Sequence, residues 1–405
     1  MNIKPVSGGT ITSPQGFLAG ATYIGLKSQG DDPLDLGILC SEAPCIAAGV
    51  FTRNKVKAAS VLLCQRNLKS NKAQAIVVNS GCANACTGKQ GLVDAEAMAA
   101  LTARNLGLRP QDVLVASTGV IGKTLPMKQV RDGIQNIVLS SDGGHTLAKA
   151  ITTTDTFPKE IAVSVKLARG DSEITIGGIA KGAGMIHPDM ATLLCFLATD
   201  AAVSPAFLKK ALKRAVDASF NMITVDGDTS PNDSVVILAN AQAGNKAIRS
   251  LSPCAEEFEE ALQEVCQFLA KSIARDGEGA TKLIEVTVEG APNVEQARCG
   301  ARTIAGSSLV KAAVHGSDPN WGRIIAALGR SGVEMNEAKV DLYLGNMCLM
   351  KAGSPLKFDK EKARSILDRG EVPIRVCLHL GKSKATAWGC DLSEEYVKIN
   401  SEYTT

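Results

Sequence analysis

The stretch KGAGMIHPDMATLLCF, from Lys181 to Phe196, holds the strongest clue to the fold. It overlaps a glycine- and proline-rich bend, Gly177 to Pro188, and leads into the apolar run TLLCFLATDAAV. That run begins at Thr192 and is rich in residues that favour β-structure. We therefore expect a close-packed turn that delivers the Ala191–Thr192 peptide bond to the first position of a buried strand.

Thr192 has two interpretations. Threonine is common at the start of a strand, and from the residues alone this structural role is the simpler one. A chemical role is also coherent, because breaking the preceding peptide bond would give Thr192 a free α-amine beside its own hydroxyl. Such an amine has an ordinary pKa of about 7.7–8.0, which suits a general base at neutral pH. One residue would then supply both nucleophile and base, without a histidine.

Strand-like and helix-like segments alternate along the chain without repeats or low-complexity stretches. Period-2 and apolar runs predict strands at 75–81, 113–120, 161–168, 172–180, 192–203, 234–240, 283–289, 340–344 and 374–380. Helical spacing predicts helices at 93–107, 204–220 and 254–275. Arg169-Gly170-Asp171 would close a hairpin. We expect an α/β fold, a layered α-β-β-α sandwich of mixed sheets with the helices outside, and no separate linker between domains.

Composition narrows the class of protein. A chain of 405 residues exceeds one hydrophobic core, so two lobes or two intertwined subunits are expected. Forty-four Lys and Arg against 41 Asp and Glu leave a charge of +3, and aromatic residues make up only 4%. Nucleic-acid binding is therefore not indicated. No apolar run reaches 18 residues and no targeting pattern is present, so we expect a cytoplasmic protein.

Motifs for metal and nucleotide chemistry are incomplete. The twelve cysteines are scattered apart from Cys82 and Cys86, and no second pair has ligand spacing, so we expect no metal. A phosphate-binding loop ending at Gly122-Lys123-Thr124 would need glycine where Ser117 stands. A calcium loop starting at Asp226 would need glycine where Pro231 stands.

Six blocks, taken in order, resemble the ornithine acetyltransferase family, the glutamate N-acetyltransferases of arginine biosynthesis. The segment around Thr192 is similar to the self-cleavage site of that family. The resemblance extends over nearly the whole chain, and ordered blocks are far more specific than one short motif. The blocks are GVFTRNKVKAA (49–59), NSGCANACTG (79–88), VASTGVIG (115–122), TTTDTFPK (152–159), DGDTSPNDS (226–234) and HGSDPNWGRI (315–324).

The resemblance implies a self-cleaved protein of the N-terminal-nucleophile type. Cleavage between Ala191 and Thr192 would give an α chain, residues 1–191, and a β chain, residues 192–405, that begins with the nucleophile. Thr118 and Gly119 match the oxyanion hole of the family, donating through a hydroxyl and a backbone N–H. From the residues alone, this pair reads as an ordinary turn at the end of a strand.

The resemblance also implies a set of substrate-binding positions. Lys181 suits a carboxylate and Glu278 suits an ammonium, as an amino-acid ligand requires. In the absence of the resemblance, these positions would read as solvated surface residues and a mobile chain terminus. The full set is Thr154, Lys181, Thr192, Glu278, Asn400 and Thr405.

The implied reaction is a ping-pong transfer of acetyl from N2-acetylornithine to glutamate through acetyl-Thr192, with no cofactor. Acetyl-CoA as a further donor and feedback inhibition stay open, and the family suggests an α2β2 heterotetramer. Two alternatives remain: a self-cleaving aminopeptidase or amidohydrolase that passes the acyl group to water, and an uncleaved metabolite-binding or scaffold protein. We expect the 226–234 and 315–324 blocks to shape loops of the active site.

Overall fold

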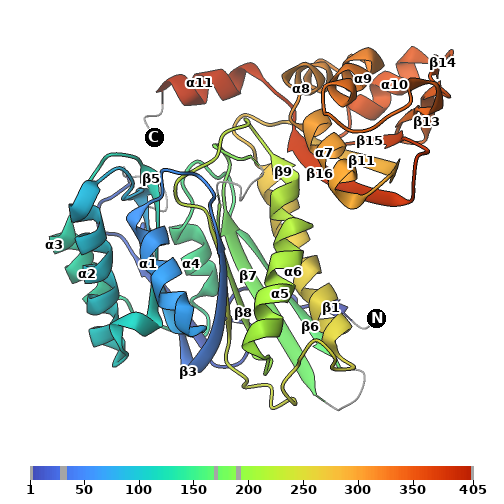
Figure 1. Cartoon of the computed structure of the whole chain (residues 1–405). Helices are drawn as coiled ribbons and strands as arrows, with labels where there is room; N and C mark the ends of the chain where they lie inside the picture. Colours follow the sequence, from blue (N-terminus) through green and yellow to red (C-terminus); the bar gives the residue numbers. More distant parts are fainter. Residues whose placement is uncertain (1–2, 28–33, 168–171, 188–192, 403–405) are drawn as a thin grey trace.

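The computed structural model describes residues 3–27, 34–167, 172–187 and 193–402. These residues form two lobes (Figure 1). Within the described residues, the larger lobe is built on a nine-stranded sheet and the smaller lobe on a seven-stranded sheet. One hydrophobic core runs from the larger lobe into the smaller one without a break. The lobes are therefore joined by packed side chains, which agrees with the absence of a recognisable linker.

The larger sheet has the order β1-β6-β7-β8-β10-β3-β4-β5, with β2 also paired to β3. Its strands are β1 (Ile3–Pro5), β2 (Phe17–Thr22), β3 (Leu36–Phe51), β4 (Lys72–Cys82), β5 (Val113–Val120), β6 (Lys159–Lys166), β7 (Glu173–Lys181), β8 (Leu194–Thr199) and β10 (Ser234–Ala239). The helices of this lobe are α1 (Ala59–Asn67), α2 (Gly88–Leu106), α3 (Met127–Asn136), α4 (Gly144–Ala150), α5 (Pro205–Asp217) and α6 (Ala255–Arg275). Short 3-10 turns lie at η1 (Leu68–Ser70), η2 (Pro110–Asp112) and η3 (Phe220–Met222).

Strand β3 belongs to both halves of this sheet. Its first part, from Leu36, pairs with β2 and β4, and its last part, up to Phe51, pairs with β10. The register with β4 shifts between Cys40 and Cys45. Pro44 lies in this interval and offers no N–H to a ladder, so the regular pairing is interrupted there. The shift allows the sheet to fold over, so that its two halves face each other.

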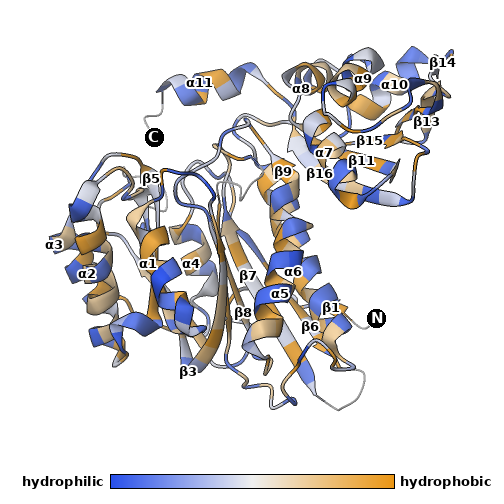
Figure 2. Ribbon diagram, in the orientation of Figure 1, coloured by the Kyte–Doolittle hydropathy of each residue, from blue (hydrophilic) through white to orange (hydrophobic). Residues whose placement is uncertain are grey.

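Alternating side chains along the strands create the layers. On β8, Leu194 and Phe196 belong to the core between the two halves of the sheet, whereas Cys195 belongs to the core under α5 and α6. On β5, Leu114 faces the inner core and Val115 the core under α2 and α3. Figure 2 shows alternating hydrophilic and hydrophobic segments along α5 and α6, as expected for helices with one buried face. The predicted α-β-β-α layering is therefore confirmed.

The smaller lobe was not predicted as a separate sheet. Its strand order is β14-β13-β12-β15-β11-β16-β9, with helix α7 packed on β11 and β16. The strands are β9 (Ile223–Thr224), β11 (Leu283–Ala291), β12 (Asp341–Leu344), β13 (Met347–Lys351), β14 (Ser354–Pro355), β15 (Glu371–Cys377) and β16 (Ser383–Cys390). The helices are α7 (Val294–Ala305), α8 (Ser308–His315), α9 (Trp321–Gly329), η4 (Glu337–Lys339), α10 (Lys360–Leu367) and α11 (Glu394–Glu402).

The elements predicted from the sequence are present with small shifts at their ends. The 113–120 strand is β5, and the predicted β4–α2–β5 unit has parallel strands. Strands β6 and β7 pair antiparallel, as the hairpin pattern indicates, although residues 169–171 lie outside the described residues. The strand expected from Thr192 is described from Leu194 onward. In the described part of the chain, no helix is long and apolar enough to cross a membrane.

Candidate active site

Six of the predicted site residues line a single pocket, although they come from five different segments. Thr118 and Gly119 lie at the end of β5, and Lys181 lies at the end of β7. The remaining predicted residues in the pocket are Thr154, Glu278 and Asn400. Ala191, Thr192 and Thr405 lie outside the described residues. The pocket is completed by residues that were not singled out: Ile121, Thr153, Gly184, Met185, Ser230 and Asn232.

The end of β5 lies in very close contact with the end of β4. The parallel register shifts between Gly81 and Cys82, opposite Gly119. Gly119 has a φ of 122°, and a Cβ atom there would lie 2.4 Å from the carbonyl carbon of Gly81. Only glycine can adopt this conformation without displacing the neighbouring backbone. The Thr118–Gly119 segment therefore borders the pocket as a fixed backbone turn.

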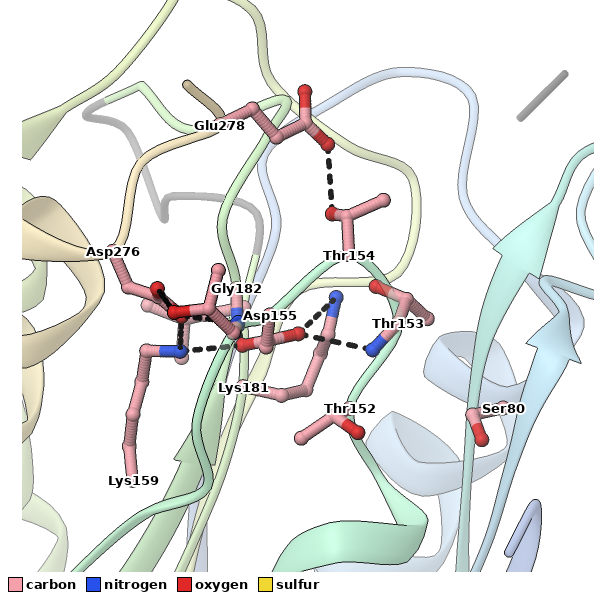
Figure 3. A network of polar contacts seen from close by, with 12 residues as sticks. Ser80, Thr152, Thr153, Thr154, Asp155, Lys159, Lys181, Gly182, Asp276 and Glu278 are labelled. Atoms are coloured by element: carbon pink, nitrogen blue, oxygen red, sulfur yellow. Dashed lines mark hydrogen bonds and ion pairs between the residues drawn. The ribbon is translucent and has the colours of Figure 1, made fainter. Parts of the chain in front are cut away.

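Glu278 holds one end of the pocket together. Its Oε1 accepts a hydrogen bond from Thr154 Oγ1 at 2.7 Å, and its Oε2 accepts one from Asn400 Nδ2 at 2.8 Å. Figure 3 shows the Thr154 side chain pointing toward Glu278. The carboxyl group lies over Gly184, where an added Cβ would come within 2.4 Å of it. A carboxylate has about four acceptor positions, so Glu278 can still accept hydrogen bonds from a ligand ammonium.

A buried ionic network lies next to the pocket residues Thr154 and Lys181 (Figure 3). Lys159 Nζ lies 2.7 Å from Asp155 Oδ1 and 2.5 Å from Asp276 Oδ2, and all three side chains are almost fully buried. The Thr156 N–H also donates to Asp276. Asp155 directly follows Thr154, and Asp276 is two residues before Glu278. The Lys159 ammonium thus ties together the two segments that carry the Thr154–Glu278 pair.

Asp155 also reaches Lys181, the second buried cation. The Lys181 Nζ atom lies 3.9 Å from Asp155 Oδ2, and the N–H of Gly182 donates to Asp155 Oδ1 at 2.7 Å. Burial tends to raise the pKa of Asp155, but the ammonium groups of Lys181 and Lys159 lower it well below its ordinary value. Burial lowers the pKa of Lys181, and Asp155 opposes this shift. Asp155 thus favours the charged form of Lys181, and an ammonium at this position can pair with a ligand carboxylate.

Five of the six blocks noted in the sequence meet around this pocket. The Asn232 amide donates to the carbonyls of Ala83 and Ser117 at 2.6 and 2.8 Å, so three blocks share one side chain. Thr52 Oγ1 donates to the Ser230 carbonyl at 2.8 Å, which adds the first block. The block that runs from Thr152 to Lys159 contributes the network described above. Segments that are far apart in the sequence therefore meet around one pocket in the folded chain.

Comparison with known proteins shows the family of this chain. Residues 18–405 match the ArgJ family. The chain belongs to the ArgJ family. The arginine biosynthesis bifunctional protein ArgJ of Dehalococcoides mccartyi is 55% identical over 397 residues, covering 98% of each chain. The protein of the same name from Symbiobacterium thermophilum is 53% identical over 399 residues, covering 98% of this chain and 99% of its own.

A solved structure also matches. It is the arginine biosynthesis bifunctional protein ArgJ of Bacillus halodurans, with 47% identity and a TM-score of 0.50. The matched region covers 50% of this chain and 96% of that one. The resemblance seen in the ordered blocks, to a family of acetyltransferase enzymes of arginine biosynthesis, is therefore confirmed.

The sixth block of this ArgJ family member does not line the pocket. Its first residue, His315, lies in the smaller lobe with Nδ1 2.8 Å from Asp391 Oδ2. Lys282 Nζ donates to the Val314 carbonyl and to Ser317 Oγ at 2.9 and 2.8 Å. These contacts brace the connection that enters β11. Among the described residues, the 315–324 block contributes no residue to the lining of the pocket, whereas Ser230 and Asn232 of the 226–234 block do.

Several residues around this pocket were missed from the sequence. Asp155, Lys159 and Asn232 lie inside blocks that were noted, so the blocks were the available signal. Asp276 had no signal, because its partner Lys159 lies 117 positions away.

The two cysteines at 82 and 86 differ in burial. Cys82 is buried, with its Sγ 3.3 Å from the Lys123 carbonyl, whereas Cys86 is exposed. Among the described residues, no group of three His, Cys, Asp or Glu side chains is arranged to hold a metal ion.

Proposed function

We propose that this chain cleaves itself between Ala191 and Thr192 and then transfers acetyl from N2-acetylornithine to glutamate through an acetyl-Thr192 intermediate. The observation that carries the proposal is the pocket, which combines Thr118 and Gly119 with a buried ammonium and a hydrogen-bonded carboxylate. The bend and β8 lead the chain to this pocket from both sides of the cleavage site. Family membership supports the same reaction.

The proposed cycle needs only groups of this chain. The Thr192 amine takes the proton of its own hydroxyl, and Oγ attacks the acetyl carbonyl. Negative charge then develops on the carbonyl oxygen, where the Thr118 hydroxyl and the Gly119 N–H donate hydrogen bonds to it. Ornithine leaves, glutamate enters, and its amine takes the acetyl group from Thr192. Both acceptor and donor are amino acids, so one pocket can serve the two half-reactions.

The charges of the pocket suit such substrates. Amino-acid substrates carry a carboxylate and an ammonium group. Each of these groups needs a partner of opposite charge in the pocket. We assign the carboxylate to Lys181, which is buried beside Asp155. We assign the ammonium to Glu278, with Thr154 and Asn400 holding the carboxylate in place. Thr405 is proposed as a further contact.

Cleavage at this position would not separate the two fragments. Strands β7 and β8 lie on either side of it and pair antiparallel, with Lys181 opposite Leu194. The ladder would therefore hold residues 1–191 and 192–405 together after cleavage. The match to the Bacillus halodurans chain covers 96% of that chain but only 50% of this one. The solved chain is therefore close in size to one of the two proposed fragments. We further propose an α2β2 assembly.

Mass spectrometry of the purified protein tests the proposal. Two species of 191 and 405 − 191 = 214 residues are expected, and acid quenching during turnover should find acetyl on the first residue of the second. A water-transferring amidohydrolase would hydrolyse acetylornithine at a rate indifferent to added glutamate. Persistence of one continuous chain in an active preparation would contradict the proposal.

We extend the proposal to acetyl-CoA as a second acetyl donor. Its support is the name of the relatives, which are called bifunctional. Acetyl transfer to glutamate should be measured with acetylornithine and acetyl-CoA side by side. Transfer from acetylornithine alone would limit this chain to one activity.

Replacing Thr118 by valine should lower kcat by about 10²–10³, because one preorganised donor to the oxyanion is lost. Valine keeps the shape of the side chain, and KM for acetylornithine should change much less. Thr118 is the better test of this region, since a side chain at Gly119 would collide with Gly81.

Steady-state kinetics with Thr118→Ser as the control make this comparison. Serine keeps the hydroxyl and should retain most of the activity. If kcat of the valine variant stays within about threefold of the parent value, the Thr118 hydroxyl is not part of the oxyanion hole.

A further inference from the structure

The segment from Asp226 to Asp233 contacts the chain on both sides of the proposed cleavage site. Before the site, Asp226 accepts hydrogen bonds from the N–H groups of Met185 and Ile186 at 2.5 and 3.0 Å. After the site, Asp233 Oδ1 accepts one from the N–H of Leu193 at 3.1 Å. Two carboxylates of one segment therefore hold the two flanks of the residues between them.

The conformation before the site needs this support. Met185 has a φ of 56°, in the left-handed region that non-glycine residues rarely adopt. The Asp226 carboxylate binds the N–H of this residue and of the next one, which stabilises the turn. Backbone held in this way close to a reacting bond can retain local strain.

Asp233 is a buried carboxylate that contacts the chain directly after the proposed cleavage site. The residue is 1% exposed, and its buried Oδ2 atom has no hydrogen-bond partner among the described residues. A buried carboxylate oxygen normally has a partner, because leaving it unpaired costs free energy. The other oxygen, Oδ1, accepts the hydrogen bond from the N–H of Leu193, and Leu193 directly follows Thr192 in the chain.

Self-cleavage poses a chemical problem that the transfer cycle does not. Before the bond is broken, the Thr192 nitrogen is an amide and cannot act as a base. Another group must then accept the hydroxyl proton. We infer that Asp233 is this proton acceptor, acting in the self-cleavage step through its Oδ2 atom. The inference rests on the proposed function, because it assigns a residue to the cleavage that the function requires.

The proposed step is balanced. Asp233 Oδ2 takes the proton of the Thr192 hydroxyl as Oγ forms a bond to the carbonyl carbon of Ala191. The C–N bond then breaks, and the proton passes from Asp233 to the departing nitrogen, which becomes the α-amine. Water hydrolyses the resulting ester, leaving the carboxylate of Ala191 and the free hydroxyl of Thr192.

The surroundings of Asp233 favour a basic carboxylate. Burial raises its pKa well above the ordinary value, while the Leu193 N–H, the hydroxyls of Thr52 and Ser230 and the charge of Lys181 oppose the shift. A higher pKa brings the group closer to the pH at which it must accept a proton. Because only the ionised form accepts the proton, the cleavage rate should fall as the pH drops, and the fall should begin above the range of an ordinary carboxyl.

The test compares Asp233→Asn with Asp228→Asn, an exposed aspartate of the same segment. Asparagine keeps an oxygen acceptor for Leu193 but cannot accept a proton. Full-length chains are made by cell-free synthesis and followed by denaturing electrophoresis at several pH values. We expect self-cleavage at least about 10²-fold slower in Asp233→Asn, with no pH dependence, and an unchanged rate in Asp228→Asn.

The other possible results distinguish failure of this inference from failure of the proposed function. Cleavage of Asp233→Asn at the parent rate would overturn it while leaving the proposed function intact, and an uncut parent chain would overturn the proposed function itself. If the asparagine variant fails to fold, the matched pair Asp233→Glu and Asp233→Gln replaces it. Faster cleavage with glutamate supports the inference, and equal rates contradict it.

Discussion

Replacing Thr192 by alanine should leave the protein as one chain of 42.3 kDa and should lower acetyl transfer to glutamate by about 10⁴–10⁶-fold. Alanine lacks the hydroxyl that attacks both the Ala191 carbonyl and the acetyl donor. The variant therefore loses cleavage and catalysis together. Denaturing electrophoresis and a coupled assay of ornithine release measure the two effects on the same sample.

Thr192→Ser is the matched control for this variant. Serine keeps a hydroxyl on Cβ and would gain the same α-amine, so both cleavage and transfer should persist. If the alanine variant is uncut but fully active, Thr192 is not the nucleophile of the transfer reaction. If the alanine variant is cut but inactive, the Thr192 hydroxyl is needed for acetyl transfer and not for self-cleavage.

Replacing Lys159 by methionine should lower the free energy of unfolding by about 3–5 kcal/mol. Asp276 would lose its cation, and Asp155 would keep only the more distant Lys181. These carboxylates are almost fully buried, so water cannot replace the lost partner. Denaturant unfolding at neutral pH measures the change, and KM for acetylornithine should rise because Thr154 and Glu278 lose their common anchor.

Lys213→Met is the control for burial. Lys213 forms an ion pair with Asp217 at 2.5 Å, the same length as the Lys159–Asp276 pair, but its side chain is 62% exposed. Exposed pairs contribute about 0–1 kcal/mol, so this variant should be nearly as stable as the parent. Equal stability of the two variants would show that the buried network does not support the site.

Local patterns predicted part of the larger lobe, whereas β1, β2, β3, α1, α3 and α4 were not predicted. The predicted strand 113–120 coincides with β5, and the helix predicted from Cys254 begins one residue later as α6. Both succeed because burial follows a short period along consecutive residues, so the pattern of apolar side chains is visible in the chain. The start of β8 shows the limit of such patterns, since the described strand begins at Leu194.

The folding over of the sheet at β3 could not be predicted in the same way. A shift of register near Pro44 has a weak local signal, and its effect depends on which strands pair on either side. The separate sheet of the smaller lobe was not predicted for a related reason, although three of its strands were. Its strands β11 and β15 pair in parallel although α7 to α10 lie between them in sequence.

The sequence established the segments of this protein and, through six ordered blocks, its family. It also contained the residue types that an acyl-transfer site needs. Their assembly depended on the folded chain, because Glu278 receives hydrogen bonds from residues 124 and 122 positions away. Such contacts depend on sheet register and on where α11 places Asn400, and neither leaves a periodic pattern in neighbouring residues.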